Sequence, residues 1–373
     1  MGVFESAPGI FLLLITVRWF QGSAFDKSIL AASVHAGLLI APIVIFTQRR
    51  FRLSAPHCMH ILLIASAALM SLAGVVTQKH YFTLLAAVAI LLQSAATPLL
   101  TSIYSENIPA TSRGRYFSQC GVIRGVSSVI FATVAGWCLS GRLHLYPVLI
   151  AVYAAALLLA SALLKRVPGA PRAPQVVASP LACFSHLRSD RVLRETIIAW
   201  NLLGFGNLMM IPLRVEYLAN GRYGLSLSEV EIALLISTIP NTARLLSIGM
   251  WGRVFDKMNF FSLRMLLNFS FAIGTLSFFA TNSWALLLCS AVLLGCTAAG
   301  GEVAWNLGVT KFTTPDKVPD YMAVHTFFTG LRGVVAPGVG FFLLQYLSPQ
   351  SLSWICAALI FSSIFVLVRI QKS

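Results

Sequence analysis

Long apolar stretches separated by short polar gaps dominate the pattern of hydrophobic positions along this chain. A helix that crosses a hydrocarbon core of roughly 30 Å needs about 20 mostly apolar residues, and about twelve stretches of that kind follow one another. The predicted spans are 6–24, 28–47, 56–76, 81–104, 116–138, 145–164, 195–218, 228–249, 262–280, 284–309, 321–346 and 350–369. The pattern therefore predicts an all-α, polytopic membrane protein.

Arginine and lysine gather in alternate gaps between these stretches, beginning with the gap that follows 28–47. The central gap is the most basic, with Lys165 and Arg166 at its start and Arg194 at its end. Lysine and arginine are enriched in cytoplasmic loops of membrane proteins. We therefore expect these gaps and both chain termini on the cytoplasmic side of a plasma or inner membrane.

The composition agrees with lipid as the solvent. Of the 373 residues, 57% are hydrophobic and 10% are charged, whereas soluble domains contain about 25% charged residues. The net charge of +15 would suggest nucleic acid as a partner. Because the positive charges lie in gaps and not on one helical face, no nucleic acid partner is expected.

The sequence lacks the motifs of several catalytic classes. No phosphate-binding GxxxxGK[ST] loop occurs, which argues against an ATP-driven pump, and neither HExxH nor GxSxG is present. The seven cysteines are scattered and form no CxxC pair. We therefore expect neither an enzyme, a metal site nor a cofactor.

The central gap divides the chain into two similar halves. We predict an N-terminal six-helix bundle over 1–166, a cytoplasmic linker over 167–193 and a C-terminal six-helix bundle over 194–373. The halves also echo each other, because a proline, a polar loop, a tyrosine and an Arg-Gly pair recur in Pro109–Gly125 and Pro315–Gly333. Repeated halves of six helices are typical of secondary transporters.

The segment "GRVFDK" lies in the predicted cytoplasmic gap after 228–249. It resembles the G-x-x-x-D-[RK] signature loop of the major facilitator superfamily. The resemblance implies two pseudo-symmetric six-helix bundles, a tight turn at the glycine, and a latch that stabilises one conformation. The corresponding first-half segment, "APIVIFTQRRFR", keeps Arg49 and Arg50 but lacks the glycine and the aspartate. The residues assigned to the latch by this resemblance are Gly252, Arg253, Asp256 and Lys257.

Charged residues inside predicted spans are candidates for substrate or ion binding, because charge in the hydrocarbon is costly. Glu302 could exchange a proton, or it could be a structural carboxylate paired with a base. Arg124 and Arg332 occupy comparable places in the two halves and could bind an anionic group, or each could lock its helix, for instance Arg332 to Glu302. His325 could titrate near neutral pH, or it could be a helix-packing residue.

Other residues extend this set. The glycines 204 and 206 with Pro212 predict a flexible or broken helix at 195–218, and Arg18 and Arg244 are expected near helix ends, where long side chains reach water. The further candidates for the cavity are Gln93, Gln119, Asn207, Trp305 and Asn306.

These features favour a secondary active transporter that moves a small solute by alternating access. We expect it to act as a monomer in the lipid bilayer, with H⁺ as the candidate coupling ion and an organic anion as the favoured substrate class. The alternative is a transport-inactive scaffold, sensor or assembly factor on the same fold. Substrate identity and direction of transport do not follow from the sequence.

Overall fold

The computed structural model describes residues 2–6, 10–108, 110–169, 182–225, 227–280, 282–314 and 317–372, and these segments contain helices and no strand. Eleven helical stretches among them are long and apolar enough to cross a membrane. The first predicted span corresponds to two short helices, α1 (Gly2–Ser6) and α2 (Leu12–Arg18). The predicted all-α, polytopic fold is confirmed.

The chain forms two compact units. The first unit comprises Met1–Val176 together with Leu218–Gly221 and Ser226–Leu234, and the second comprises Val177–Tyr217, Arg222–Leu225 and Leu235–Ser373. Residues 170–181 of the predicted linker lie outside the described residues, and 186–189 at its other end form the short helix α9. The predicted boundaries of the two bundles and the linker stay a prediction.

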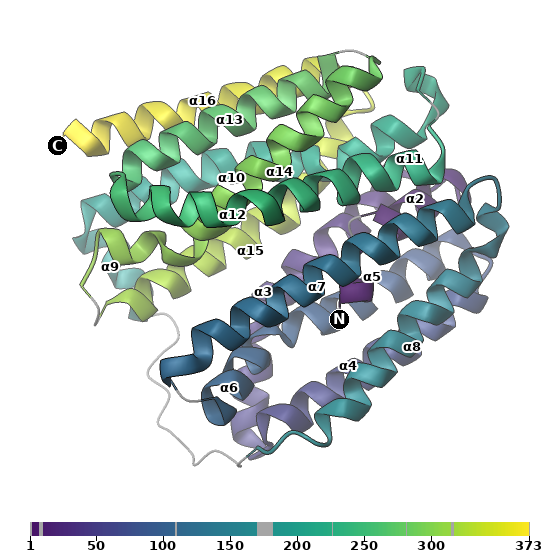
Figure 1. Ribbon diagram of the computed structural model, residues 1–373, viewed down its shortest axis with the longest axis horizontal. Helices are drawn as coiled ribbons and strands as arrows, with labels where there is room; N and C mark the ends of the chain where they lie inside the picture. The colour runs from purple at the N-terminus through teal and green to yellow at the C-terminus, as the bar shows by residue number, and fades with distance from the viewer. Residues whose placement is uncertain are drawn as a thin grey trace. The chain divides into compact units, whose positions relative to one another are not determined.

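The first unit is built mainly from α3 to α8 (Figure 1). Within it α3 packs on α5, and α4 packs on both α5 and α8. The helix bounds are Ala24–Arg50 for α3, Ala55–Val75 for α4, Lys79–Ala95 for α5, Thr97–Asn107 for α6, Ala110–Leu139 for α7 and Tyr146–Leu164 for α8.

One predicted span of this unit is two helices. The sequence predicts a single helix over 81–104, but α5 ends at Ala95 and α6 begins at Thr97. Pro98 stands in the first turn of α6 and has no N–H to donate to the preceding turn. A proline is well accommodated at a helix start, so the chain interrupts the helix there and begins it again.

The second unit contains α10 and α12 to α16 (Figure 1). Here α12 packs on α14, and α13 packs on α14 and α16. A short helix of the first unit, α11 (Glu229–Ala233), continues through a π-helical turn, Leu234–Thr238, into α12. The helix bounds are Arg191–Ala219 for α10, Ile239–Lys257 for α12, Phe260–Ala280 for α13, Trp284–Leu307 for α14, Val318–Leu343 for α15 and Pro349–Lys372 for α16.

Helix α10 contradicts the prediction of a break. It runs without interruption from Arg191 to Ala219, with Pro212 inside it. A Cβ atom added at Gly206 would lie 2.7 Å from the carbonyl oxygen of Cys356. This glycine therefore allows α10 to approach α16 closely, and it does not open the helix.

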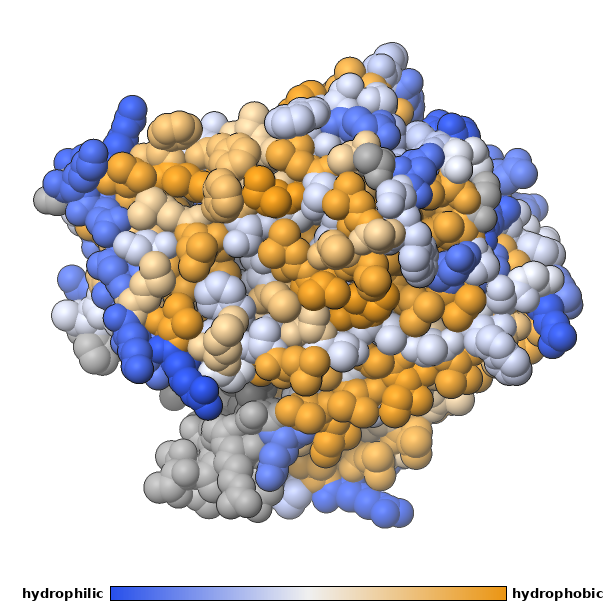
Figure 2. Space-filling model, turned by 45° about the horizontal axis from the view of Figure 1, so that its top comes forward, coloured by the Kyte–Doolittle hydropathy of each residue, from blue (hydrophilic) through white to orange (hydrophobic). Residues whose placement is uncertain are grey.

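Large apolar side chains cover much of the exterior. Val75, Trp137 and Leu246 are each more than 70% exposed, and on the face drawn in Figure 2 hydrophobic residues form broad areas with hydrophilic residues gathered at the borders. In water such areas would cause association. In a bilayer they contact lipid, as the composition predicts.

Candidate functional site

A charged pair lies within two membrane-spanning helices of the second unit. Nη1 of Arg244 on α12 donates to Oε2 of Glu302 on α14 at 2.7 Å. Both side chains keep access to the exterior, with 19% of the Arg244 side chain and 40% of the Glu302 side chain exposed. The expectation that Arg244 lies near a helix end is wrong, because it lies midway along the helical stretch Glu229–Lys257, where Glu302 holds its charge.

The turn of α14 that follows Glu302 carries two other predicted residues. Asn306 is exposed, and its Nδ2 donates to the backbone carbonyl of Glu302 at 2.8 Å. Trp305 is partly buried, and its ring centroid lies 5.3 Å from that of His325 on α15. Glu302 and Asn306 are one turn apart and share a face of the helix.

Arg332 is buried and makes no contact with Glu302. Its Nη1 donates to the backbone carbonyl of Trp200 at 2.8 Å, and its Nη2 donates to Oγ1 of Thr329 at 3.1 Å. The alternative in which Arg332 pairs with Glu302 is therefore wrong. The reason is a close fit against α10, where a Cβ atom added at Gly204 would lie 2.2 Å from Nε of Arg332.

A second buried arginine, Arg264 on α13, lies beside the same tryptophan. Its guanidinium carbon is 5.8 Å from the ring centroid of Trp200, and the residue is 5% exposed. His325 is 1% exposed, its ring centroid is 4.0 Å from that of Trp200, and both its ring nitrogens lack a hydrogen-bond partner. The sequence interpretation overlooked Arg264 in this role, although its position inside the predicted span 262–280 was a usable signal.

The remaining candidates are spread over both units. Arg124 on α7 and Gln119 on the same helix are exposed, and Gln93 on α5 is partly buried. Arg124 belongs to the first unit and Arg332 to the second. On α10, Oδ1 of Asn207 is buried without a partner. Among the described residues, no group of three or more His, Cys, Asp or Glu side chains could hold a metal ion.

Comparison with known protein families gives a match in the second half of the chain. The model of the Major Facilitator Superfamily matches residues 220–372. No curated protein sequence matches this chain.

Solved structures share its fold along almost the whole chain. The D323A mutant of the nucleoside transporter NupG superimposes with a TM-score of 0.79 at 15% identity, covering 99% of this chain and 96% of that chain. A D-xylose–proton symporter gives 0.65 at 18% identity, with 98% and 92% covered. The human organic anion transporter MFSD10 (TETRAN) gives 0.64 at 18% identity, with 92% and 83% covered. At these identities the likeness shows the fold.

The signature segment lies inside a helix. Gly252–Lys257 forms the last turns of α12, and a Cβ atom added at Gly252 would meet nothing within 4 Å. The tight turn expected at Gly252 is therefore wrong. The chain turns after Lys257, where Oδ1 of Asn259 accepts the N–H of Phe261 at 2.9 Å and so begins α13. The side chains of Arg253, Asp256 and Lys257 are exposed.

An ion pair that the sequence did not indicate lies in the first unit. Arg18 on α2 donates from Nη1 to Oε1 of Glu229 on α11 at 2.7 Å. Its Nε donates to the carbonyl of Ala219 at 3.0 Å, and its Nη2 donates to the carbonyl of Leu227. Arg18 is the last residue of α2, so its predicted place near a helix end is confirmed, and these acceptors hold its guanidinium, which keeps 19% exposure.

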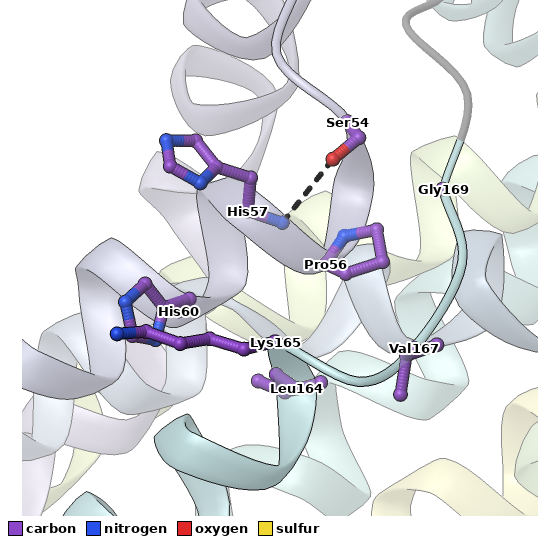
Figure 3. A pocket seen from close by; sticks show the side chains of 8 residues that line it. All are labelled: Ser54, Pro56, His57, His60, Leu164, Lys165, Val167 and Gly169. Atoms are coloured by element: carbon purple, nitrogen blue, oxygen red, sulfur yellow. Dashed lines mark hydrogen bonds between the residues drawn. The ribbon is translucent and has the colours of Figure 1, made fainter.

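A pocket of about 420 Å³ lies where α8 ends and α4 begins (Figure 3). His57 and His60 come from α4, and Lys165 follows α8. Nδ1 of His60 lies 2.7 Å from Oγ of Ser161. The lining is basic and without a carboxylate, in keeping with a position in the predicted cytoplasmic region. The lining residues are Ser54, Pro56, His57, His60, Leu164, Lys165, Val167 and Gly169.

Proposed function

We propose that this chain is a transporter of the major facilitator superfamily, namely a proton-coupled secondary active transporter for a small organic anion that acts as a monomer by alternating access. The pair between Arg244 and Glu302 carries the proposal. Charges within membrane-spanning helices are costly and are retained mainly at substrate and ion pathways. Because 40% of the Glu302 side chain is exposed, protons can reach it.

The pair suggests how proton and anion binding are linked. Protonation of Glu302 would remove the negative charge that holds Arg244. The Arg244 guanidinium would then be free to bind a carboxylate of the solute in bidentate geometry. Proton and anion would bind together and leave together, which is the requirement for coupled movement in one direction. Each would shift the balance between inward-open and outward-open states.

The choice of an anion rests on charge and not on fold. The structural neighbours are a nucleoside transporter, a D-xylose–proton symporter and an organic anion transporter, so one fold carries several substrates. The second unit buries Arg264 and Arg332 without a carboxylate partner among the described residues. An excess of buried positive charge favours negative solutes.

The other predicted residues have supporting roles in this proposal. The exposed charged face at the end of α12, with Arg253, Asp256 and Lys257, would stabilise one of the two conformations, as the signature implies. Gly252 would act through close helix approach in the other conformation. The residues proposed to contact solute along the pathway are Gln93, Gln119, Arg124, Asn207, Trp305, Asn306, His325 and Arg332.

The test is uptake into proteoliposomes with a pH gradient imposed across the membrane. Wild-type protein should accumulate labelled organic anions against their gradient. The Glu302→Gln variant should lose accumulation driven by the pH gradient but keep exchange of internal for external anion. The Glu195→Gln variant changes a carboxylate in a surface pair with Arg191 and should behave as wild type.

Two results would contradict the proposal. Accumulation by Glu302→Gln that still follows the pH gradient would remove Glu302 as the coupling group. A wild-type protein that binds anions and cations but moves neither would favour the transport-inactive alternative. The first-half segment without the signature glycine and aspartate is compatible with that alternative.

A further inference from the structure

Three polar side chains meet around one tryptophan in the interior of the second unit. We call Trp200, Arg264, His325 and Arg332 the Trp200 cluster. They come from α10, α13 and α15, and each is at most 9% exposed. The ring of His325 and the guanidinium of Arg264 lie 4.0 Å and 5.8 Å from the Trp200 ring centroid, and Arg332 donates to the Trp200 carbonyl.

The cluster has donors in excess of acceptors. The Nε atoms of both arginines, Nε1 of Trp200 and both ring nitrogens of His325 are buried without a partner. Arginine and the indole N–H can only donate, and a histidine ring carries at least one N–H in either charge state. A buried donor without a partner loses its hydrogen bonds to water and destabilises the fold. The missing component is therefore an acceptor.

The cluster also lacks negative charge. Arg264 makes no hydrogen bond or ion pair with the part of the chain that the structure describes, and the charges of Arg264 and Arg332 repel each other. The described carboxylates of this unit are engaged or exposed elsewhere: Glu302 holds Arg244, and Asp190 accepts from Tyr321. Arginine remains protonated inside proteins, so the positive charge cannot be relieved by losing a proton.

We propose that the Trp200 cluster is a binding site for one small anion, held by Arg264 and Arg332 beside the Trp200 ring. The ligand is a halide or a carboxylate group, because a small anion supplies charge and acceptors together without needing donors in return. The site lies inside one unit and shares His325 and Arg332 with the proposed solute pathway, but anion binding to the cluster does not require transport. Arg264 is only four residues past the start of α13, about 6 Å along the helix, so the anion would enter from the predicted cytoplasmic side.

The test measures anion binding by the purified full-length protein. Chloride is titrated at constant ionic strength against the bulkier anion 2-hydroxyethanesulfonate, and thermal unfolding and tryptophan fluorescence are followed. The midpoint temperature should rise and saturate, as for any ligand that binds the folded state. Acetate titrated in the presence of chloride separates the two ligand sources: competition indicates a site that takes carboxylates, and no competition indicates a halide site.

Variants assign the effect to the cluster. Arg264→Gln and Arg332→Gln should each raise the half-saturating chloride concentration roughly 10- to 100-fold, because a hydrogen bond to a charged group contributes about 1.5–3 kcal/mol. Arg369→Gln removes an exposed arginine of α16 in the same unit and should leave the half-saturating chloride concentration unchanged. Equal half-saturation in Arg264→Gln and wild type, or no saturable effect of chloride and acetate on wild type, would overturn the proposal.

A second measurement needs no variant. Crystals of the wild-type protein grown with bromide should give an anomalous scattering peak within hydrogen-bonding distance of Arg264 or Arg332. If the arginine variants do not fold, the anomalous bromide peak alone tests whether the Trp200 cluster binds an anion. Its absence at bromide concentrations that saturate the thermal effect would contradict the assignment to this cluster.

Discussion

At the scale of single residues, hydrogen-bond partners explain where several half-buried charges lie. Asp190, which precedes α10, illustrates this. Its Oδ1 accepts the N–H of Leu193 at 3.0 Å and its Oδ2 accepts the hydroxyl of Tyr321 at 2.5 Å. The carboxylate thus caps one helix and ties it to another.

The pKa of Asp190 predicts a pH dependence of stability. Burial raises this pKa, but the hydrogen bonds from Tyr321 and the backbone lower it more, so the net shift is below the usual range. A carboxylate with a depressed folded-state pKa stabilises the fold above its unfolded pKa of about 3.9, and this contribution is lost as pH falls through the folded pKa. Asp190→Asn should therefore lower the unfolding temperature at pH 7 and approach wild type near pH 3.

Thermal unfolding at several pH values measures the difference in unfolding temperature between Asp190→Asn and wild type. Asparagine also caps helices, so the substitution isolates the charge. Tyr321→Phe removes one donor and should show a smaller deficit with the same pH trend. A deficit of Asp190→Asn that stays constant from pH 7 to pH 3 would contradict the assignment.

Gly204 gives a second prediction at this scale. A methyl group there would lie 2.2 Å from Nε of Arg332, so Gly204→Ala must displace the arginine from the Trp200 carbonyl. Gly249→Ala is the matched control, because an added Cβ meets nothing within 4 Å and alanine favours helix by up to about 1 kcal/mol. Thermal unfolding should show Gly204→Ala destabilised and Gly249→Ala unchanged or stabilised. Equal stability of the two variants would show that Arg332 has another position.

At the scale of helices, the apolar pattern predicted most elements and failed where chemistry overrides it. The prediction 56–76 matches α4, Ala55–Val75, because the apolar stretch begins at the capping residue Ser54. The prediction 228–249 stops short of Lys257, because the last turns of α12 are helical although charged. The predicted membrane spans place Arg264 and Glu302 inside the membrane. The ion-pair partner of Glu302 could not be predicted from the sequence, because Arg244 lies 58 positions away from it.

The ion pair between Arg18 and Glu229 joins helices 211 positions apart in the sequence. Glu229 is 6% exposed, and its Oε2 also accepts the N–H of Gly141 at 3.3 Å, so three segments meet at one carboxylate. Removing one partner of a buried ion pair lowers the free energy of unfolding by about 3–5 kcal/mol. The loss should be smaller for this pair, because 19% of the Arg18 side chain is exposed. We expect Glu229→Gln to lower the unfolding temperature clearly.

A double-mutant cycle separates the pair from its surroundings. Arg18→Gln and Glu229→Gln together should cost less than the sum of the single changes, with a coupling of about 1–3 kcal/mol. The exposed pair between Arg191 and Glu195 is the control and should show at most about 0.5 kcal/mol. Additive effects at Arg18 and Glu229 would mean that the pair contributes no stability.

At the scale of the whole molecule, the two halves share a plan but differ in chemistry. The described parts of the two repeated segments, from Ala110 to Gly125 and from Val318 to Gly333, lie on α7 and α15. Arg124 is exposed on α7, whereas Arg332 is buried beside Trp200 on α15. The sequence could align these arginines but could not predict their different surroundings, because burial depends on helices that pack around them. The ion pair of Arg244 and the Trp200 cluster both belong to the second unit.

The distribution of charge predicts how the chain is inserted. Lysine and arginine gather at the gap that begins with Lys165 and at the chain end with Arg369 and Lys372, whereas the loop at Gly141 and Arg142 belongs to the poorer set. Because cytoplasmic loops are enriched in positive residues, Lys165 and Lys372 should lie on one side and Arg142 on the other. Each is replaced singly by cysteine in a variant that lacks the seven natural cysteines, and a membrane-impermeant thiol reagent is applied to intact cells.

Cysteine at 142 should react in intact cells, and cysteines at 165 and 372 should react only after the membrane is permeabilised. All three positions lie at helix ends or in short connections, so a failure to react would not come from burial. Labelling of 165 and 372 from opposite sides would require an odd number of crossings between them. That result would contradict both the predicted paired bundles and the alternating-access mechanism, which needs two halves with the same orientation across the membrane.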